Sequence, residues 1–322
     1  MIPLGNAYFA WPLNDRFAGG FAVNTPFGLK TDYDDPWVGR FQGIKSELRT
    51  INANPALSYR LNDWVVLGVG ADYQHAHAEL TNAVLLGPAT EGRADLEASD
   101  DAWGWNAGAI FILPGSTRIG VSYRSRMSFS LDGDTSVTTL AGLPIAAASG
   151  PTRVDITFPG SAELSAAQPL GGGFELRADV NWMEWSKVDT VLAVNSLTGV
   201  PRDVLNFGFK DTVRAAIGLD YKRDERWSFR AGTAWDQSPV RDADRTVRLP
   251  DNDRWWVTTG ARWRPTDNLM VDAAYAHLFV RDTSIALTRG QTGAPPSFSS
   301  TVVGDYDSSV DILSVQLTWA FH

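Results

Sequence analysis

Large apolar side chains alternate with small or polar ones along most of this chain. In the last ten residues, LSVQLTWAFH, every second position from Leu313 to Phe321 is large and apolar, and the positions between them hold Ser, Gln, Thr and Ala. The segments 174–182, 213–222 and 227–236 repeat this pattern. Because successive residues of a strand point to opposite faces, a period of two predicts β-strands with one apolar face and one small, polar face. Stretches with the 3.6-residue period of a helix are scarce.

Two kinds of connection separate these runs. Short ones contain turn residues, as in Pro-Thr-Asp-Asn at 265–268, whereas longer ones near 85–98, 138–151, 195–210, 241–251 and 289–300 are polar or rich in Gly and Pro. Their alternation predicts up-and-down hairpins that open toward two different compartments. The predicted strands, about thirteen in number, cover residues 5–12, 16–25, 44–61, 64–84, 99–113, 117–137, 152–168, 173–194, 211–222, 227–240, 252–264, 269–288 and 302–321.

The two faces indicate a membrane barrel rather than a soluble β-sandwich, which also alternates. The small face repeatedly holds Arg or Asp between Gly and Ala, as in a crowded polar lumen, and Trp and Tyr gather near strand ends, as in the aromatic girdles of outer-membrane barrels. We therefore predict an all-β fold: one transmembrane, antiparallel, up-and-down β-barrel domain spanning residues 1–322, in the bacterial outer membrane. The large apolar row faces lipid in this interpretation.

Composition narrows the function. The chain has no Cys, which excludes disulfides and thiolate metal sites, and its net charge of −9 argues against a nucleic-acid partner. The four His residues leave little material for zinc binding or for a hydrolase, and His277 has no evident catalytic partner. His75 and His77 share one strand face, but a solvated strand end explains them better than a metal site. We predict no enzyme activity, no metal and no cofactor.

Several ordered segments resemble the outer-membrane long-chain fatty acid transporter family, which also includes channels for aromatic and aliphatic hydrocarbons. They are GFKD at 208–211, WSFRAG at 227–232, DQSPV at 236–240 and LPDNDR at 249–254, preceded by PFGLKTDY at 26–33, NPALSYRLND at 54–63 and SYRSRM at 122–127. The resemblance spans essentially the whole chain. It implies a fourteen-stranded barrel with an N-terminal hatch in its lumen, loops that capture substrate, an apolar interior pocket and lateral release through the wall.

The N-terminus departs from that family pattern. MIPLGNAYFAWPLND has neither a basic region nor a long apolar region, so it is not a signal peptide. The chain begins near what resembles the second strand of the family. We therefore expect about thirteen of fourteen strands, with the hatch and the first strand absent from this sequence.

Four residues are candidates for the opening in the wall: Pro26, Phe27, Gly28 and Leu29. In the family, an inward kink in an early strand opens the wall, and these residues match that kink. Pro lacks a donor for the β-ladder and Gly permits unusual dihedrals, so the strand is predicted to break here. An ordinary transition from strand to loop is the alternative.

Basic residues on the small face are the second set of candidates, namely Lys210, Arg214, Arg230 and Arg254. Ion pairing between neighbouring strands is the favoured role, and binding of a ligand carboxylate is the alternative. In the fatty acid branch, basic residues inside the barrel meet the ligand's carboxylate. One of those positions matches Leu80, which cannot bind an anion, so weak discrimination between a fatty acid and a neutral hydrocarbon is expected.

Apolar residues in the segment 138–150 form the third set: Leu140, Leu143, Pro144 and Ile145. An apolar stretch in a long loop predicts an interaction surface, here for the first capture of substrate, unless the loop packs on its own barrel. Acidic segments at 32–35 and 242–244 could bridge lipopolysaccharide through divalent ions, although solubility also explains them.

These observations predict outer-membrane transport of long-chain fatty acids or other hydrophobic compounds, by a monomer surrounded by outer-membrane lipid and lipopolysaccharide. The alternative is a general porin for polar solutes.

Overall fold

The computed structural model describes residues 5–87, 90–290 and 298–321. Within these ranges no helix is long and apolar enough to cross a membrane. Three short 3₁₀ helices, η1 (Pro114–Ser116), η2 (Trp185–Lys187) and η3 (Asp242–Asp244), accompany the strands. The rest of the regular structure is β-strand.

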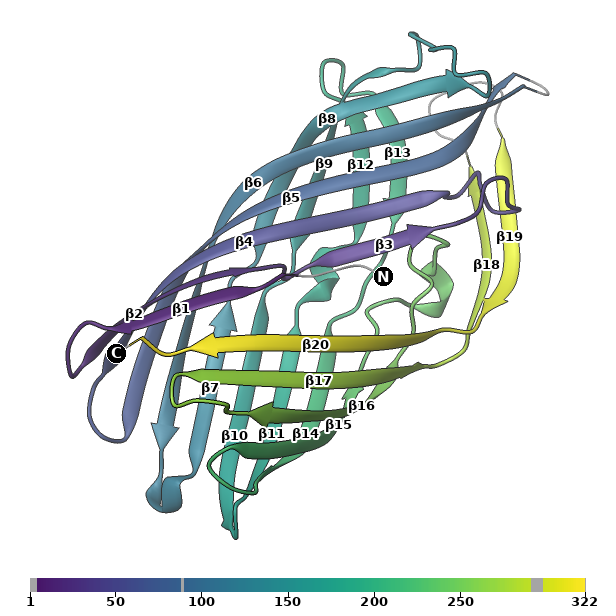
Figure 1. Cartoon of the computed structure of the whole chain (residues 1–322). Helices are drawn as coiled ribbons and strands as arrows, with labels where there is room; N and C mark the ends of the chain where they lie inside the picture. Colours follow the sequence, from purple (N-terminus) through teal and green to yellow (C-terminus); the bar gives the residue numbers. More distant parts are fainter. Residues whose placement is uncertain (1–4, 88–89, 291–297, 322) are drawn as a thin grey trace.

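One sheet of 18 strands curves into the wall of a barrel (Figure 1). Its first ten strands are β1 (Ala7–Pro12), β2 (Phe17–Asn24), β3 (Gly28–Asp32), β4 (Lys45–Arg60), β5 (Val65–Gly87), β6 (Thr90–Ile112), β7 (Arg118–Arg124), β8 (Met127–Thr139), β9 (Gly150–Phe158) and β10 (Ser161–Gly171). The others are β11 (Phe174–Met183), β12 (Thr190–Asn195), β13 (Pro201–Asn206), β14 (Thr212–Lys222), β15 (Trp227–Asp236), β16 (Arg254–Trp263), β17 (Leu269–Val280) and β20 (Ser309–Trp319). The strands β18 (Thr283–Gly290) and β19 (Ser299–Tyr306) form a separate two-stranded sheet.

Neighbouring strands are antiparallel throughout, and several passes along the wall are interrupted. For example, β2 and β3 both pair with β4, and β7 and β8 both pair with β6. Counting each interrupted pass once gives thirteen passes for the described chain, as the alternation predicts. The two end strands, β1 and β20, share no hydrogen-bond register in the described structure, although the rings of Phe9 and Phe321 lie 6.5 Å apart.

The predicted loop at 85–98 is wrong, because most of it is strand. Residues 79–85 of β5 pair with 91–97 of β6, and residues 92–97 of β6 also pair with β8, so this hairpin continues the wall. Alternating small and polar residues here carry little apolar signal, and cross-strand pairing decides the structure. The predicted loop at 195–210 likewise contains β13, which pairs with β12.

The two faces are as predicted over most of the wall, but on β8 and β9 the apolar row, which includes Phe129 and Phe158, faces the lumen instead of lipid. On β14 the exposed row includes Ile217, Leu219 and Tyr221, with Leu219 39% exposed, whereas Ala216 and Asp220 line a cavity inside the barrel. Aromatic rings stack along the outer surface near strand ends, as for Trp227 and Trp263, whose centroids are 6.0 Å apart. An apolar outer band with aromatic borders fits a wall surrounded by lipid.

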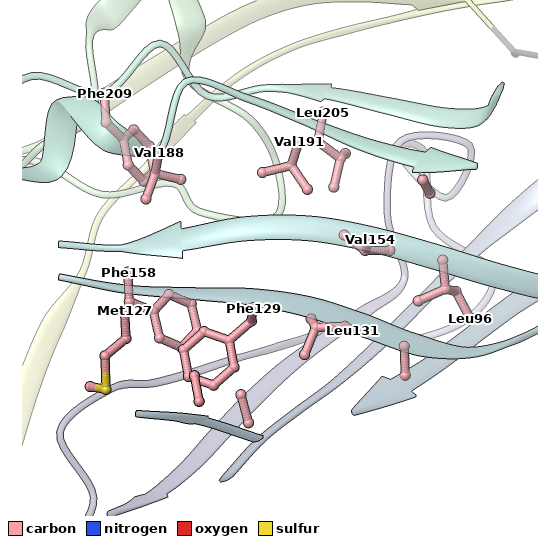
Figure 2. Packing of buried hydrophobic residues seen from close by; sticks show 14 of the residues in the cluster. Leu96, Met127, Phe129, Leu131, Val154, Phe158, Val188, Val191, Leu205 and Phe209 are labelled. Carbon is pink, nitrogen blue, oxygen red and sulfur yellow. The ribbon is translucent and has the colours of Figure 1, made fainter. Parts of the chain in front are cut away.

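Apolar side chains also fill part of the interior, toward the end of the barrel that carries the long loops. We call this group the lumen cluster; it includes Leu96, Met127, Phe129, Leu131, Val154, Phe158, Val188, Val191, Leu205 and Phe209. Figure 2 shows residues from β8 and β9 facing residues from β12, β13 and the segments beside them. Toward the end with short turns, the interior is polar instead.

Candidate functional site

A cavity of about 350 Å³ opens beside the lumen cluster at the long-loop end. Its walls include Leu80 of β5, Leu96 of β6, Val154 of β9 and Leu205 of β13. A cavity of this size with apolar walls suits a chain-like apolar molecule. Binding there would remove apolar surface of the molecule from water, which contributes about 25 cal/mol per Å² to the free energy of binding. Leu80 therefore lines a cavity and offers it only apolar surface.

One end of the cavity is basic. Arg202 and Asp203 of β13 and Arg289 of β18 line it, and Arg289 forms an ion pair with Asp203. Arg202 donates from Nη1 to the carbonyl oxygen of Ala148 at 2.6 Å, while its buried Nε has no hydrogen-bond partner among the described residues. Arg202 thus brings to the cavity a cation that pairs with no carboxylate in the described chain.

A third guanidinium adds to the positive charge there. Arg248 is buried, and it donates to neutral acceptors, the carbonyl oxygen of Lys45 at 3.0 Å and Oγ of Ser46 at 2.8 Å. Burial lowers the pKa of Arg248 to about 10; Asp203 opposes this shift and the nearby Arg289 adds to it. With three guanidinium groups near one carboxylate, this end of the cavity favours an anion.

The wall breaks at the residues that the sequence predicts. β2 ends at Asn24, opposite Asn52, and β3 begins at Gly28, opposite Arg49, so three residues of this pass face two of β4. Pro26 and Phe27 lie in the break, and Gly28 and Leu29 begin β3. Thr50 bridges the irregularity, because its Oγ accepts from the Phe27 amide at 2.9 Å and donates to the Phe27 carbonyl at 2.7 Å.

The break turns the ring of Phe27 into the barrel. Its centroid lies 5.0 Å from that of Phe158 and 5.9 Å from that of Trp185, so Phe27 packs against the lumen cluster. The residue in the gap of the wall is therefore in direct contact with the apolar interior.

Three of the four basic candidates are ion paired. Arg214 lies 2.9 Å from Asp179, Arg230 lies 3.0 Å from Asp272, and Arg254 lies 3.1 Å from Asp236. They belong to a charge ladder on the lumen face, made of Arg118, Arg177, Arg214, Arg230, Arg254 and Arg262 with Glu175, Asp179, Asp220, Asp236 and Asp272. These three arginines are thus ion paired in the structure, and they are not among the residues that line the cavity.

Lys210 lies between β13 and β14. Its amide donates to the carbonyl oxygen of Pro239 at 3.0 Å. Its ammonium group has no hydrogen bond or ion pair within the described residues, and it is not among the residues that line the cavity. A ligand contact for Lys210 stays a prediction.

The loop after β8 is folded and exposes apolar side chains. Leu140 is 74% and Leu143 65% exposed, and Pro144 is also exposed, whereas Ile145 is half-buried and its amide donates to the carbonyl oxygen of Val137 at 2.8 Å. The loop ends at Ala147 and Ala148, which line the cavity. An apolar surface therefore lies beside the cavity, and its role in capture stays a prediction.

The His candidates pair with acids on the outer surface of the wall. Nδ1 of His75 lies 2.9 Å from Asp101, and Nδ1 of His277 lies 2.8 Å from Asp311. His77 lies 3.8 Å from Glu97. Among the acidic candidates, Asp242 pairs with Arg245 at 2.7 Å.

Sequence reasoning misses Arg202, Arg248 and Arg289. Arg202 and Arg289 lie in segments predicted to be loop or loop edge, and Arg289 meets Asp203 across 86 positions of the chain. The only local signal is the short alternation in PRDVLN at 201–206, which forms β13.

The chain is similar to known outer-membrane proteins over most of its length. The long-chain fatty acid transport protein of Escherichia coli O6:H1 is 28% identical over 92% of this chain and 73% of its own length. Outer membrane protein P1 of Haemophilus influenzae is 30% identical over 85% of this chain and 65% of its own length.

Solved structures show the same fold. A crystal structure of a Pseudomonas aeruginosa FadL homologue superposes with a TM-score of 0.89 at 23% identity, covering 98% of this chain and 78% of that one. The Pseudomonas putida toluene transporter TodX gives a TM-score of 0.74 at 17% identity, covering 98% of this chain and 82% of that one.

The family model of the outer membrane protein transport proteins (OMPP1/FadL/TodX) matches residues 2–321. This match confirms the predicted location in the outer membrane and the prediction of a transporter rather than an enzyme. The chain belongs to the OMPP1/FadL/TodX family of outer-membrane transport proteins.

Proposed function

We propose that this chain transports hydrophobic molecules with an acidic head group, holding them in the cavity and releasing them sideways at the break between β2 and β3. The continuity of apolar surface carries the proposal. Leu96, Val154, Val191 and Leu205 line the cavity and also belong to the lumen cluster, and the same cluster contacts Phe27 at the break. An apolar chain moving along this path stays against apolar side chains throughout.

The distribution of charge supports release through the wall rather than along the axis. Beyond the lumen cluster, a second cavity of about 430 Å³ is lined by members of the charge ladder, including Arg177, Asp179 and Asp220. An apolar molecule that moved into this cavity would displace water from charged groups, which is unfavourable. The break at Phe27 offers an exit before the molecule meets those charges.

A general porin for polar solutes is the second candidate. A porin needs a continuous polar path, and the polar second cavity supplies part of one. In the described structure, however, Phe129, Phe158 and Phe209 pack across the interior with at most 7% exposure. Their packing favours the hydrophobic substrate.

The basic end of the cavity supports an acid as the head group. Arg202 has a buried Nε without a partner, and a carboxylate is the acceptor that guanidinium binds best. The long-chain fatty acid transport proteins among the relatives carry such acids by name. A hydrogen bond to a charged group is worth about 1.5–3 kcal/mol, which is enough to distinguish an acid from a hydrocarbon of equal length.

A competition assay tests the proposal. We expect oleate to displace a fluorescent fatty acid from the purified protein at a concentration about tenfold or more below that of a matched alkene. In Arg202→Met the advantage should shrink to about twofold, since the apolar walls remain. The matched control Arg177→Met, in the charge ladder, should keep the wild-type ratio. Equal displacement by acid and alkene in the wild type would reject the acidic head group.

A further inference from the structure

The wall has a second interruption, between β6 and β8. β6 pairs with β7 at residues 106–112 and with β8 at residues 92–99, but no register joins residues 100–104 of β6 to 127–131 of β8. At one end of this stretch the Ser125 amide donates to the carbonyl oxygen of Trp105 at 2.9 Å, and side-chain hydrogen bonds form at both ends. Oγ of Ser125 accepts from the Trp105 amide at 2.9 Å, and a carboxylate oxygen of Asp100 accepts from the Ser130 amide at 2.7 Å.

The same ribbon is also detached on its other side. β9 pairs with β12 only at residues 152–154, so residues 155–158 have no register partner there. Residues 127–131 and 154–158 nevertheless pair with each other along their whole length. We call residues 127–131 with 155–158 the flap. A cleft of about 360 Å³ borders it on the β12 side, lined by residues that include Asp155 and Thr190.

The two faces of the flap differ in polarity. Its inner face carries Met127, Phe129, Leu131 and Phe158, all at most 3% exposed within the lumen cluster (Figure 2). Its outer face carries polar side chains that bond to one another, Ser128 to Thr157 at 2.9 Å and Ser130 to Asp155 at 2.7 Å. Because these bonds lie within the ribbon, the flap can move away from its neighbours without losing them.

Met127 closes the gap on the β6 side. A Cβ atom added to Gly104 would lie 2.8 Å from Cγ and 2.9 Å from Sδ of Met127, so the absence of a side chain at Gly104 makes room for this contact. Methionine is flexible and adapts to irregular gaps. Trp103, 70% exposed beside the gap, and Trp105 mark the height at which the membrane border is expected.

One aromatic ring connects this gap with the break at Phe27. The centroid of Phe158 lies 5.0 Å from that of Phe27 and 4.9 Å from that of Phe129. A molecule that displaces Phe158 from the lumen cluster therefore reaches both interruptions of the wall.

We propose that the flap is a second lateral passage, through which the apolar part of the substrate moves between the lumen cluster and the outer leaflet at head-group height. This proposal rests on the function proposed above. The two passages act in parallel, so either one supports transport when the other is closed.

Two changes close the passages separately. The chain has no Cys, so Gly104→Cys with Met127→Cys supplies the only pair of thiols. A Cβ at Gly104 would lie 2.8 Å from Cγ of Met127, so its distance to Cβ of residue 127 differs from this by at most one carbon–carbon bond and is close to the roughly 3.5–4.5 Å of a disulfide. Oxidation would fix the flap to β6. Deletion of Pro26 removes the extra residue opposite β4 and evens the register of β2 and β3.

The readout is the rate at which a bound fluorescent fatty acid moves from the reconstituted protein into the surrounding bilayer. We expect each closure alone to slow transfer by about twofold and both together by about tenfold or more, with recovery when the disulfide is reduced. Unchanged binding of the dye in every form, measured in micelles, shows that the variants are folded, and the reduced double-Cys protein is the matched control.

Three results would overturn the second passage. Oxidation that leaves the rate unchanged in both backgrounds rejects the flap, and so does deletion of Pro26 that alone abolishes transfer; in the latter case the proposed function stands. If the doubly closed protein transfers the dye at the wild-type rate while binding it normally, lateral release itself is wrong, and the proposed function fails with it.

Discussion

At the scale of single residues, the face of the strand on which a side chain lies decides its surroundings. Leu219 and Ala216 are three positions apart on β14 yet lie on opposite faces, one exposed on the outer surface and the other lining the second cavity. A charge placed at these two positions therefore meets lipid in one case and a polar lumen in the other.

This difference gives the first prediction at this scale. Leu219→Arg should lower the free energy of unfolding in micelles or bilayers by about 2–4 kcal/mol, as Arg does near the middle of a lipid-facing strand. Ala216→Arg, the matched change on the other face, should alter the lumen with a much smaller loss. Denaturant titration of both variants measures the difference, and equal losses would contradict the assignment of the faces.

The sequence predicts some functional residues and not others for a physical reason. Pro26 lacks an amide hydrogen and Gly28 permits unusual dihedral angles, so the sequence alone predicts a break in the strand. The structure has the break at these residues. The basic end of the cavity has no such local signal. Arg202 and Arg289 come together only because β13 and the β18–β19 hairpin fold to the same end of the barrel. That arrangement depends on long-range pairing, which no short segment encodes.

At the scale of elements, alternation predicts where strands run but not where they are interrupted. The alternation in the sequence predicts one strand for β7 with β8 and one for β9 with β10. Met127, Phe129 and Phe158 occupy alternate positions that continue the apolar row of the neighbouring strand in the sequence. Their detachment follows from register shifts against β6 and β12, which the apolar pattern alone does not reveal.

The loop that follows β8 gives the prediction at this scale. Leu140→Ser with Leu143→Ser should slow association of a fluorescent fatty acid by about threefold to tenfold, because the variant lacks the exposed apolar surface that is predicted to capture the substrate. Dissociation and unfolding should change little, since both side chains are mostly exposed. Stopped-flow binding measures both rates.

Leu197→Ser is the matched control for this change. Leu197 is 81% exposed in the loop between β12 and β13, and it is not part of the predicted capture surface. If Leu197→Ser slows association as much as the double variant, capture is not specific to the loop after β8.

At the scale of the whole molecule, the charge ladder holds neighbouring strands in register around the lumen. Asp272 of β17 is central to it, because its carboxylate lies 3.0 Å from both Arg230 of β15 and Arg262 of β16. One acid thus joins three consecutive strands. Its side chain is only 12% exposed, whereas each arginine is partly solvated.

Asp272→Asn should therefore lower the free energy of unfolding by about 1–2 kcal/mol, less than for a fully buried pair because water screens the arginines. Asp267→Asn, in the exposed turn before β17, is the matched control and should change it by less than about 0.5 kcal/mol. Urea titration of the two variants in the same micelles measures this. A loss in Asp267→Asn as large as that in Asp272→Asn would show that the ladder adds nothing.

The apolar lumen cluster lies above the charged second cavity inside the barrel, and this order has a consequence for the cell. Small ions and polar toxins are soluble in the charged half of the lumen, but they would have to shed their hydration water to cross the lumen cluster. Hydrophobic molecules have the opposite preference and, in the function proposed above, leave through the wall before the charged half begins. If release is lateral as proposed, the barrel admits hydrophobic nutrients while the outer membrane keeps its permeability barrier to ions and polar compounds.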